Sequence, residues 1–119
     1  MHELSIAHSI VAMVSESAER MPSAQIHEVR LRVGALAGVT TGALLFCYDI
    51  ATQDTQLAGS KLVVKDLAVI IFCPQCRQER ELPGVQSFRC PVCDTPSGDI
   101  RQGRELEIES VVVDEYAST

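Results

Sequence analysis

The N-terminal segment carries apolar residues at the spacing of an amphipathic helix. Between residues 4 and 21 the repeat consists of Leu4, Ala7, Val11, Val14, Ala18 and Met21, widened by Ile6, Ile10 and Met13. This stripe predicts a helix that buries one face, ended by Pro22 and Ser23. From residue 26 to 33 the period changes to two, which predicts a half-buried strand closed by Gly34. Its apolar side is Val29, Leu31 and Val33, and its polar side is Glu28, Arg30 and Arg32.

The rest of the chain continues this mixed order of helices and strands. A turn at residues 38–42 offers N-cap residues and predicts a second helix from about 43 to 53. Residues 61–72 have the pattern of one strand that runs directly into a cysteine, and residues 105–113 have the pattern of a last strand. In that last strand we expect Leu106, Ile108 and Val112 on one side and Glu105, Glu107 and Glu109 on the other. The predicted order is therefore α-β-α-β, a cysteine-rich insert, and β.

The insert at residues 73–103 holds four of the five cysteines and has too few apolar residues to fold without a cross-link such as a bound metal. We therefore expect one domain formed by residues 1–72 and 104–119, and a second domain inserted at 73–103. A length of 119 residues fits one small core with such a stapled unit.

Charge and hydropathy narrow the class of protein. The net charge is −6 and the pI is near 4.9, which argues against a phosphate-binding, nucleic-acid protein. No apolar run approaches the roughly 20 residues that span a bilayer. The N-terminus lacks the basic and apolar regions of a secretory signal. We expect a cytoplasmic protein, in which reduced, paired cysteines hold a metal and do not form disulfides.

The cysteines form two C-x-x-C pairs, Cys73-Pro-Gln-Cys76 and Cys90-Pro-Val-Cys93, separated by 13 residues. One tight turn brings each pair of sulfurs onto the same ion, and two such turns complete a tetrahedral thiolate set. Four thiolates leave no open coordination position, so the pattern predicts a structural zinc site. The fifth cysteine, Cys47, stands alone in an apolar helical stretch and is expected to be buried and inert.

Other interpretations of these pairs fit less well. A thioredoxin-like redox pair explains one C-x-x-C and not two. Iron in a rubredoxin-like site is the main alternative. In such sites the residue after each C-x-x-C pair is usually Gly and aromatic residues surround the metal, whereas here Arg77 and Asp94 follow the two pairs and aromatics are scarce. A nucleic-acid-binding zinc ribbon needs a basic face, and the insert mixes arginines with acidic residues. With no open metal site, activated nucleophile or Gly-rich phosphate loop, we do not expect an enzyme.

The N-terminal Met1-His2-Glu3 offers a second kind of metal chemistry. The α-amine of Met1, the deprotonated amide of His2 and its imidazole Nδ1 can form adjoining chelate rings around Ni(II) or Cu(II), which accept planar nitrogen sets. Glu3, another side chain or a partner protein would supply the fourth ligand. Taken by themselves, these residues leave open the alternative that His2 binds no metal, because a histidine near a terminus is more often an ordinary exposed residue. His8 and His27 have no spaced partner ligand and are expected to be structural or solvated.

The run Met1-His2-Glu3-Leu4-Ser5-Ile6, the two C-x-x-C pairs and residues 103–110, GRELEIES, together resemble the HypA/HybF family of hydrogenase nickel-incorporation proteins. The stretch from Val29 to Gly34 is similar to the first strand of that family. The resemblance covers the whole chain in order and length.

What the resemblance implies is a nickel metallochaperone that helps to load Ni²⁺ into the large subunit of [NiFe]-hydrogenase, with urease served in some organisms. It implies a GTPase maturation partner, possible homodimers and no nucleic-acid or membrane partner. The nickel ligand of the family falls on His2, with Met1 and Glu3 beside it, and its Zn²⁺ ligands fall on Cys73, Cys76, Cys90 and Cys93. The turn before the second helix offers only Val39 and Thr40 for a further nickel ligand. The implied fold is α+β, with two helices on a small mixed three-stranded sheet and an inserted zinc-ribbon-like domain built on the four cysteines.

Overall fold

The computed structural model describes residues 2–22 and 24–115. In this part of the chain it contains two helices and six strands, in the order α1 His2–Ala18, β1 Ala24–Gly34, α2 Thr41–Ala51, β2 Lys61–Leu67, β3 Ile70–Cys73, β4 Gln78–Glu81, β5 Ile100–Gln102 and β6 Leu106–Glu115. The strands form two three-stranded sheets, with orders β2-β1-β6 and β4-β3-β5. The predicted α+β fold class, with two helices, a small sheet and a separate four-cysteine unit, is confirmed.

The chain divides into two compact units. The helical unit contains the chain up to Leu31, Val39–Val64 and the segment from Ile108 onward; the cysteine unit contains Arg32–Gly38 and Lys65–Glu107. The long strands therefore contribute residues to both units. Which segments fold independently, predicted above as 1–72 with 104–119 against 73–103, stays a prediction.

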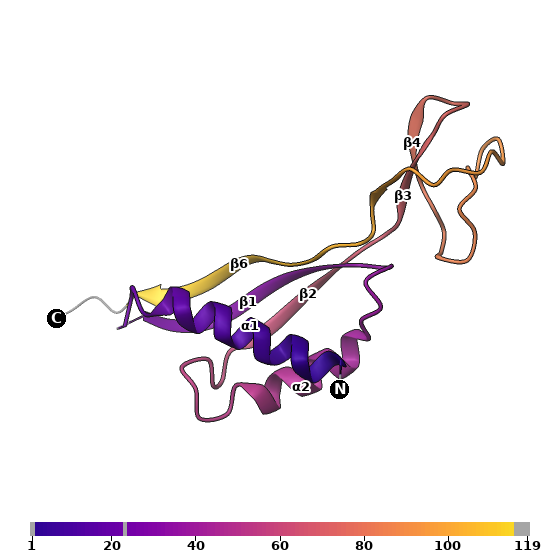
Figure 1. Ribbon diagram of the computed structural model, residues 1–119. Helices are drawn as coiled ribbons and strands as arrows, with labels where there is room; N and C mark the ends of the chain where they lie inside the picture. Colours follow the sequence, from indigo (N-terminus) through magenta and orange to yellow (C-terminus); the bar gives the residue numbers. More distant parts are fainter. Residues whose placement is uncertain (1, 23, 116–119) are drawn as a thin grey trace. The chain divides into compact units, whose positions relative to one another are not determined.

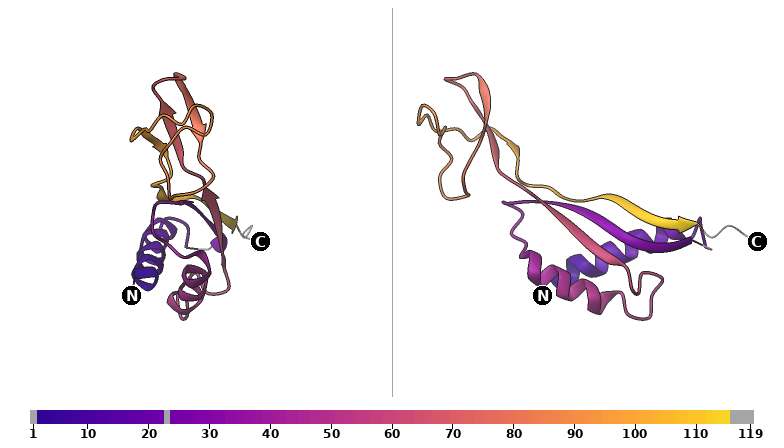
Figure 2. Two further views of the ribbon diagram at one scale, coloured as in Figure 1. Left: turned by 90° about the vertical axis from the view of Figure 1, so that its right-hand side faces the viewer. Right: turned by 180° about the vertical axis from the view of Figure 1, so that it is seen from behind.

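In the helical unit, α1 and α2 cover one face of the sheet (Figures 1 and 2). Figure 1 shows β1 and β2 running in the same direction and β6 running back against them, so the sheet is mixed. The apolar stripe of α1 packs inward as its spacing predicts. Its buried residues are Ala7, Ile10, Val11, Val14 and Ala18. The predicted apolar side of β1 is likewise buried, with Val29, Leu31 and Val33 each at most 3% exposed.

The first helix is shifted relative to its predicted bounds, from about residues 4–21 to His2–Ala18. It ends early because the next amides bond three residues back: Met21 N–H donates to the Ala18 carbonyl at 3.0 Å, which closes a tight turn that Pro22 does not extend. It begins early, so that His2 and Glu3 form its first turn.

The prediction of one strand over residues 61–72 is wrong. β2 ends at Leu67 and β3 begins at Ile70, and the two strands belong to different sheets. The backbone changes partners in between: the Leu67 carbonyl accepts from Ala35 N–H at 2.9 Å, and the Val69 carbonyl accepts from Leu82 N–H at 2.8 Å. Residues 67–72 are all apolar, so the hydrophobic pattern could not reveal this change.

The uniform alternation predicted for the last strand breaks between Ile108 and Val111. Although they are three residues apart, both line a surface hollow beside Met13 and Ser17 of α1. A slip of one residue in the alternation is what a β-bulge produces.

In the cysteine unit, the backbone at Gly34 passes close to that at Gly103. A Cβ added to Gly34 would overlap the carbonyl group of Gly103, so no larger residue fits there without movement of the backbone. The approach is held by two hydrogen bonds of 2.7 Å, from Gly34 N–H to the Glu105 carbonyl and from Leu36 N–H to the Gly103 carbonyl.

Beside this crossing, Val69, Ile71 and Leu82 form a small buried cluster with Leu36, Phe88 and Ile100 packed against it. Within the described residues, no helix has both the length and the hydropathy needed to cross a membrane.

Candidate metal centre

Each C-x-x-C pair lies at the tip of a hairpin. The first hairpin is β3–β4, in which Cys73 pairs with Gln78. The second runs from Phe88 to Ser97 and is held by Ser97 N–H donating to the Phe88 carbonyl at 2.9 Å. Closer to its tip, Cys90 N–H donates to the Thr95 carbonyl, also at 2.9 Å. The two hairpins therefore present two thiols each.

The two tips have the same backbone geometry. Arg77 N–H returns to the Cys73 carbonyl at 2.7 Å, and Asp94 N–H returns to the Cys90 carbonyl at 2.8 Å. Both Arg77 and Asp94 have left-handed backbones, with φ of 56° and 63°. The turn that usually carries Gly after the second cysteine is thus present without it. Contrary to the expectation from the sequence, the residues that follow the pairs do not argue against a rubredoxin-like turn, and only the scarcity of aromatic residues still favours zinc over iron.

The four sulfurs gather at one point, and all lie within 4.8 Å of one another. The Cys73–Cys93 and Cys76–Cys93 Sγ distances are both 3.5 Å, and the Cys76–Cys90 distance is 3.9 Å. Zn–S bonds of about 2.3 Å place the sulfurs of a regular tetrahedron about 3.8 Å apart. A disulfide would need only about 2.05 Å between sulfurs. The spacing therefore fits a tetrathiolate ion and not a pair of disulfides.

Backbone and side-chain donors stabilise negative charge on part of this set. Burial raises the pKa of Cys90, but the N–H groups of Cys93 and Val92 outweigh it and bring that pKa to about 6. The Val92 N–H lies 3.4 Å from the Cys90 sulfur. The Thr95 hydroxyl, 3.1 Å from the Cys93 sulfur, together with the Thr95 N–H, lowers the pKa of Cys93.

Cys76 behaves in the opposite way. Arg80 lowers its pKa, but the adjacent thiols, with Cys93 first among them, and burial together raise it to about 11. Four thiolates this close repel one another, so the set ionises fully only when a cation shares the charge. The arrangement can therefore hold a divalent metal ion.

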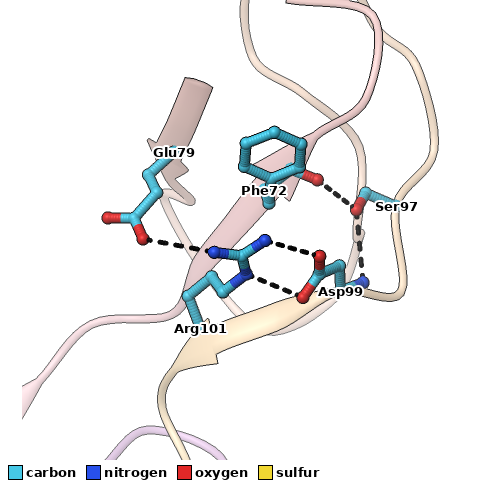
Figure 3. A network of polar contacts seen from close by, with 5 residues as sticks. All are labelled: Phe72, Glu79, Ser97, Asp99 and Arg101. Atoms are coloured by element: carbon cyan, nitrogen blue, oxygen red, sulfur yellow. Dashed lines mark hydrogen bonds and ion pairs between the residues drawn. The ribbon is translucent and has the colours of Figure 1, made fainter. Parts of the chain in front are cut away.

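A polar network braces the strand that carries the first cysteine (Figure 3). The Arg101 guanidinium donates to both carboxylate oxygens of Asp99 at 2.8 and 2.9 Å, approaches Glu79 at 3.9 Å, and lies 4.6 Å from the centre of the Phe72 ring. The Ser97 hydroxyl donates to the Phe72 carbonyl at 2.5 Å. These contacts join the exit of the second hairpin to β3, next to Cys73.

The N-terminal candidates lie in the first turn of α1. Met1 lies outside the described residues. His2 is exposed, and Glu3 is partly buried. A Glu3 carboxylate oxygen accepts a hydrogen bond of 3.2 Å from Thr40 N–H at the start of α2, where the Thr40 side chain makes no capping bond. This hydrogen bond is the main cause that lowers the pKa of Glu3.

The remaining candidates lie apart from any ligand set. Cys47 is 4% exposed in α2, as predicted for a buried thiol. His8 is exposed, and His27 bonds to Asp114. Over residues 2–22 and 24–115, only the four cysteines form a group of three or more His, Cys, Asp or Glu side chains close enough to share an ion.

Sequence reasoning missed three contributors to these sites. They are the contacts of Thr95 with Cys93, of Arg80 with Cys76, and of Thr40 with Glu3. The Thr95 contact is local, because Thr95 lies only two residues after Cys93 in the same turn. The contacts of Arg80 and Thr40 depend on strand register and on the pairing of two helices, which no local pattern contains.

Comparison with known proteins agrees with this architecture. The family model described as "Hydrogenase/urease nickel incorporation, metallochaperone, hypA" matches residues 1–113. A hydrogenase maturation factor HypA from Chloroflexus aurantiacus is 49% identical over 108 residues, which are 91% of this chain and 95% of that protein.

Two solved structures are similar in fold. The solution structure of a HypA protein has a TM-score of 0.70 at 19% identity and covers 98% of both chains. The solution structure of the Ni metallochaperone HypA from Helicobacter pylori has a TM-score of 0.60 at 20% identity, over 92% of this chain and 94% of that one.

Proposed function

The chain belongs to the HypA family of hydrogenase/urease nickel-incorporation metallochaperones, and we propose that it carries Ni(II) on its Met1-His2-Glu3 motif and delivers it to the large subunit of [NiFe]-hydrogenase. A GTPase maturation partner takes part in the delivery, and the urease system is the alternative recipient. The protein acts in the cytoplasm, catalyses no reaction and can form a homodimer. Nickel is its cargo, and a zinc ion in the four-cysteine site is structural.

The observation that carries the nickel assignment is the start of α1 at His2. The first amides of a helix have no partner within the helix, so a metal can replace the proton of the His2 amide without breaking a helical hydrogen bond. The exposed imidazole of the same residue completes a chelate ring with that nitrogen. In a chain that begins at Met1, its α-amine adds a third nitrogen in the same plane, which suits Ni(II).

In this proposal Glu3 both accepts a hydrogen bond from Thr40 and binds nickel. One carboxylate oxygen accepts from Thr40 N–H, which ties the first turn of α1 to the start of α2. In this proposal the carboxylate also supplies the fourth nickel ligand. The bond to Thr40 then fixes the carboxylate beside the other ligands and lowers its pKa, so that it binds as the anion.

The zinc assignment rests on the tetrahedral spacing of four thiols from two hairpins. When bound, the ion supplies cross-linking between the hairpins and holds the thiolates ionised. Cys73 and Cys90, one from each hairpin, are at most 2% exposed, so the ion is covered on their side, whereas Cys93 is exposed. Only the scarcity of aromatics separates zinc from iron here, so the metal content of the purified protein tests this assignment.

The test of the nickel site compares two histidines on the same helix. In untagged protein, His2→Ala should abolish high-affinity nickel binding in a calorimetric titration, while His8→Ala should leave it unchanged. Both residues are exposed, so neither change should alter zinc content or shift the free energy of unfolding by more than about 0.5 kcal/mol. Equal nickel binding by wild type and His2→Ala would refute the assignment.

A second test separates backbone ligands from side-chain ligands. Two residues added before Met1 convert its amine to a peptide amide, so nickel binding should weaken although His2 and Glu3 are intact. If the extended protein binds nickel as tightly as the native one, the α-amine is not a ligand and the site is built from side chains.

A further inference from the structure

Strand register places one arginine on the same face as the metal-binding cysteines. In the β3–β4 pair, Ile71 lies opposite Arg80 and Cys73 lies opposite Gln78. Directly paired residues of antiparallel strands share a face, and neighbours along a strand alternate. Arg80 therefore lies on the side of Cys73, whereas Glu79 lies on the other side, where it approaches Arg101 (Figure 3).

The guanidinium of Arg80 lies within interaction range of one thiol from each hairpin, Cys76 and Cys90. Its Nε is buried and has no hydrogen-bond partner among the described residues. A buried donor without a partner is rare in folded proteins. Here it lies next to a group that becomes a strong acceptor once the thiols ionise.

The charge of a loaded site explains why a cation belongs there. Four thiolates around a divalent ion carry a net charge of −2. Two other arginines near the cysteines are engaged elsewhere: Arg89 donates to the Asp94 carbonyl at 3.2 Å, and Arg101 is held by Asp99. Arginine keeps its charge at every relevant pH, and its planar guanidinium can donate hydrogen bonds to two acceptors at once.

We propose that Arg80 is the charge-compensating residue of the cysteine site: it faces the sulfurs of Cys76 and Cys90, balances part of the negative charge of the loaded site and slows the loss of the bound ion. It is a positioning residue and not a ligand. Its role in the protein is to keep the resident ion from exchanging with the carried one. This inference rests on the proposed zinc occupancy of the site.

The experiment uses the full-length zinc-loaded chain and three variants. Arg80→Gln removes the charge, Arg80→Lys keeps it, and Arg104→Gln is the matched control, because Arg104 is exposed in the same unit and changes the net charge by the same amount. Zinc transfer to an excess of a coloured chelator is followed in time. Loss of a hydrogen-bonding partner of a metal ligand typically weakens metal binding about 10- to 100-fold. We expect zinc release from Arg80→Gln to be faster by a factor in that range, and release from the other two to stay within about threefold of wild type, since neither loses the charge at the sulfurs.

A second readout separates charge compensation from a merely structural role. In cobalt-substituted protein, the sulfur-to-cobalt charge-transfer band should move to lower energy in Arg80→Gln, because sulfurs that lose a positive neighbour give up electrons more readily. The band should stay in place in Arg104→Gln. This measurement needs only that the variant still binds cobalt, and Arg80→Met, which also removes the charge, replaces Arg80→Gln if that variant does not fold.

Three results would overturn the inference. They are equal zinc release from Arg80→Gln and Arg104→Gln, an unmoved cobalt band in Arg80→Gln, and release from Arg80→Lys as fast as from Arg80→Gln. Wild-type protein that contains no zinc would instead overturn the proposed occupancy of the site. Failure of the two proposals is therefore distinguishable.

Discussion

Tyr48 offers a sharp test of how α2 is held in the helical unit. It is 1% exposed, and its hydroxyl lies 2.7 Å from the Ser60 hydroxyl. The Ser60 hydroxyl also donates to the Leu57 carbonyl at 2.5 Å. Because Ser60 has a single hydroxyl proton and uses it on Leu57, Tyr48 must be the donor in its own bond. The chain of hydrogen bonds therefore runs from Tyr48 through Ser60 to Leu57.

The direction of these hydrogen bonds determines how much stability each variant should lose. Tyr48→Phe keeps the ring and removes one buried hydrogen bond, which should lower the free energy of unfolding by about 1 kcal/mol. Ser60→Ala removes the central group and leaves the buried Tyr48 hydroxyl without a partner, while the Leu57 carbonyl keeps its bond from the N–H of residue 60; this variant should cost about 2 kcal/mol. Urea unfolding of both variants and of the double variant measures these values. The double variant should cost less than the sum of the two.

The pH dependence gives an independent check. Burial is the largest of the causes that raise the pKa of Tyr48 above 10.0. A group with a raised folded-state pKa contributes stability that is complete below its unfolded pKa and is lost as pH rises through the folded value. Stability should therefore fall at alkaline pH, above about 10, and fall less steeply in Tyr48→Phe. The other tyrosine, Tyr116, remains in that variant as a reference for the absorbance of tyrosinate.

Two results would refute this account of Tyr48. One is a cost of Ser60→Ala no larger than that of Tyr48→Phe, which would mean that the proton direction is wrong. The other is an alkaline loss of stability that is as steep in Tyr48→Phe as in wild type, which would place the responsible titration elsewhere.

Further predictions concern the two metal sites. Cys73→Ser and Cys90→Ser should each release the zinc and broaden the amide NMR signals of the cysteine unit while those of the helical unit persist; full zinc retention in either would contradict the site. Arg77→Gly should raise the free energy of unfolding of the loaded protein by roughly 0.5–1 kcal/mol, because Gly adopts the left-handed conformation without strain. Asp94→Gly should gain less stability, because Asp tolerates that conformation better than Arg does. A loss of stability in Arg77→Gly would show that the side chain of Arg77 matters more than its backbone. Glu3→Gln should preserve the protection of the Thr40 amide from hydrogen exchange and weaken nickel binding, and equal nickel affinity would remove Glu3 from the ligand set.

Patterns with a local physical cause could be predicted from the sequence. The stripe of α1 and the alternation of Val29, Leu31 and Val33 follow from burial of one face, and both are confirmed. The clustering of four sulfurs follows from the reach of two short turns, and the structure brings them within 4.8 Å. The first two patterns each lie within one element, and each cysteine pair lies within one turn; that the two pairs meet follows from their sharing one ion.

Features with a non-local cause could not be predicted in this way. The change of sheet between Leu67 and Ile70 depends on which strand lies alongside, and the apolar run through residues 67–72 contains no sign of it. The left-handed residues at Arg77 and Asp94 were missed because their geometry is imposed by the hydrogen bonds of the turn, against the intrinsic preference of an arginine. Judged from the sequence, the absence of Gly after each C-x-x-C pair argued against a rubredoxin-like turn.

The two proposed sites differ in how their ligands are connected, and this difference suits their two tasks. The four cysteines come from two hairpins 13 residues apart, each closed by backbone hydrogen bonds, so release of an ion from all four requires the hairpins to separate. The proposed nickel ligands are adjacent residues in the sequence, and the hydrogen bond from Thr40 N–H to Glu3 ties them to the next helix. An incoming partner that competes for this amide, or for the Glu3 carboxylate, can open the nickel site without disturbing either sheet. The same protein can thus retain one ion while it surrenders another.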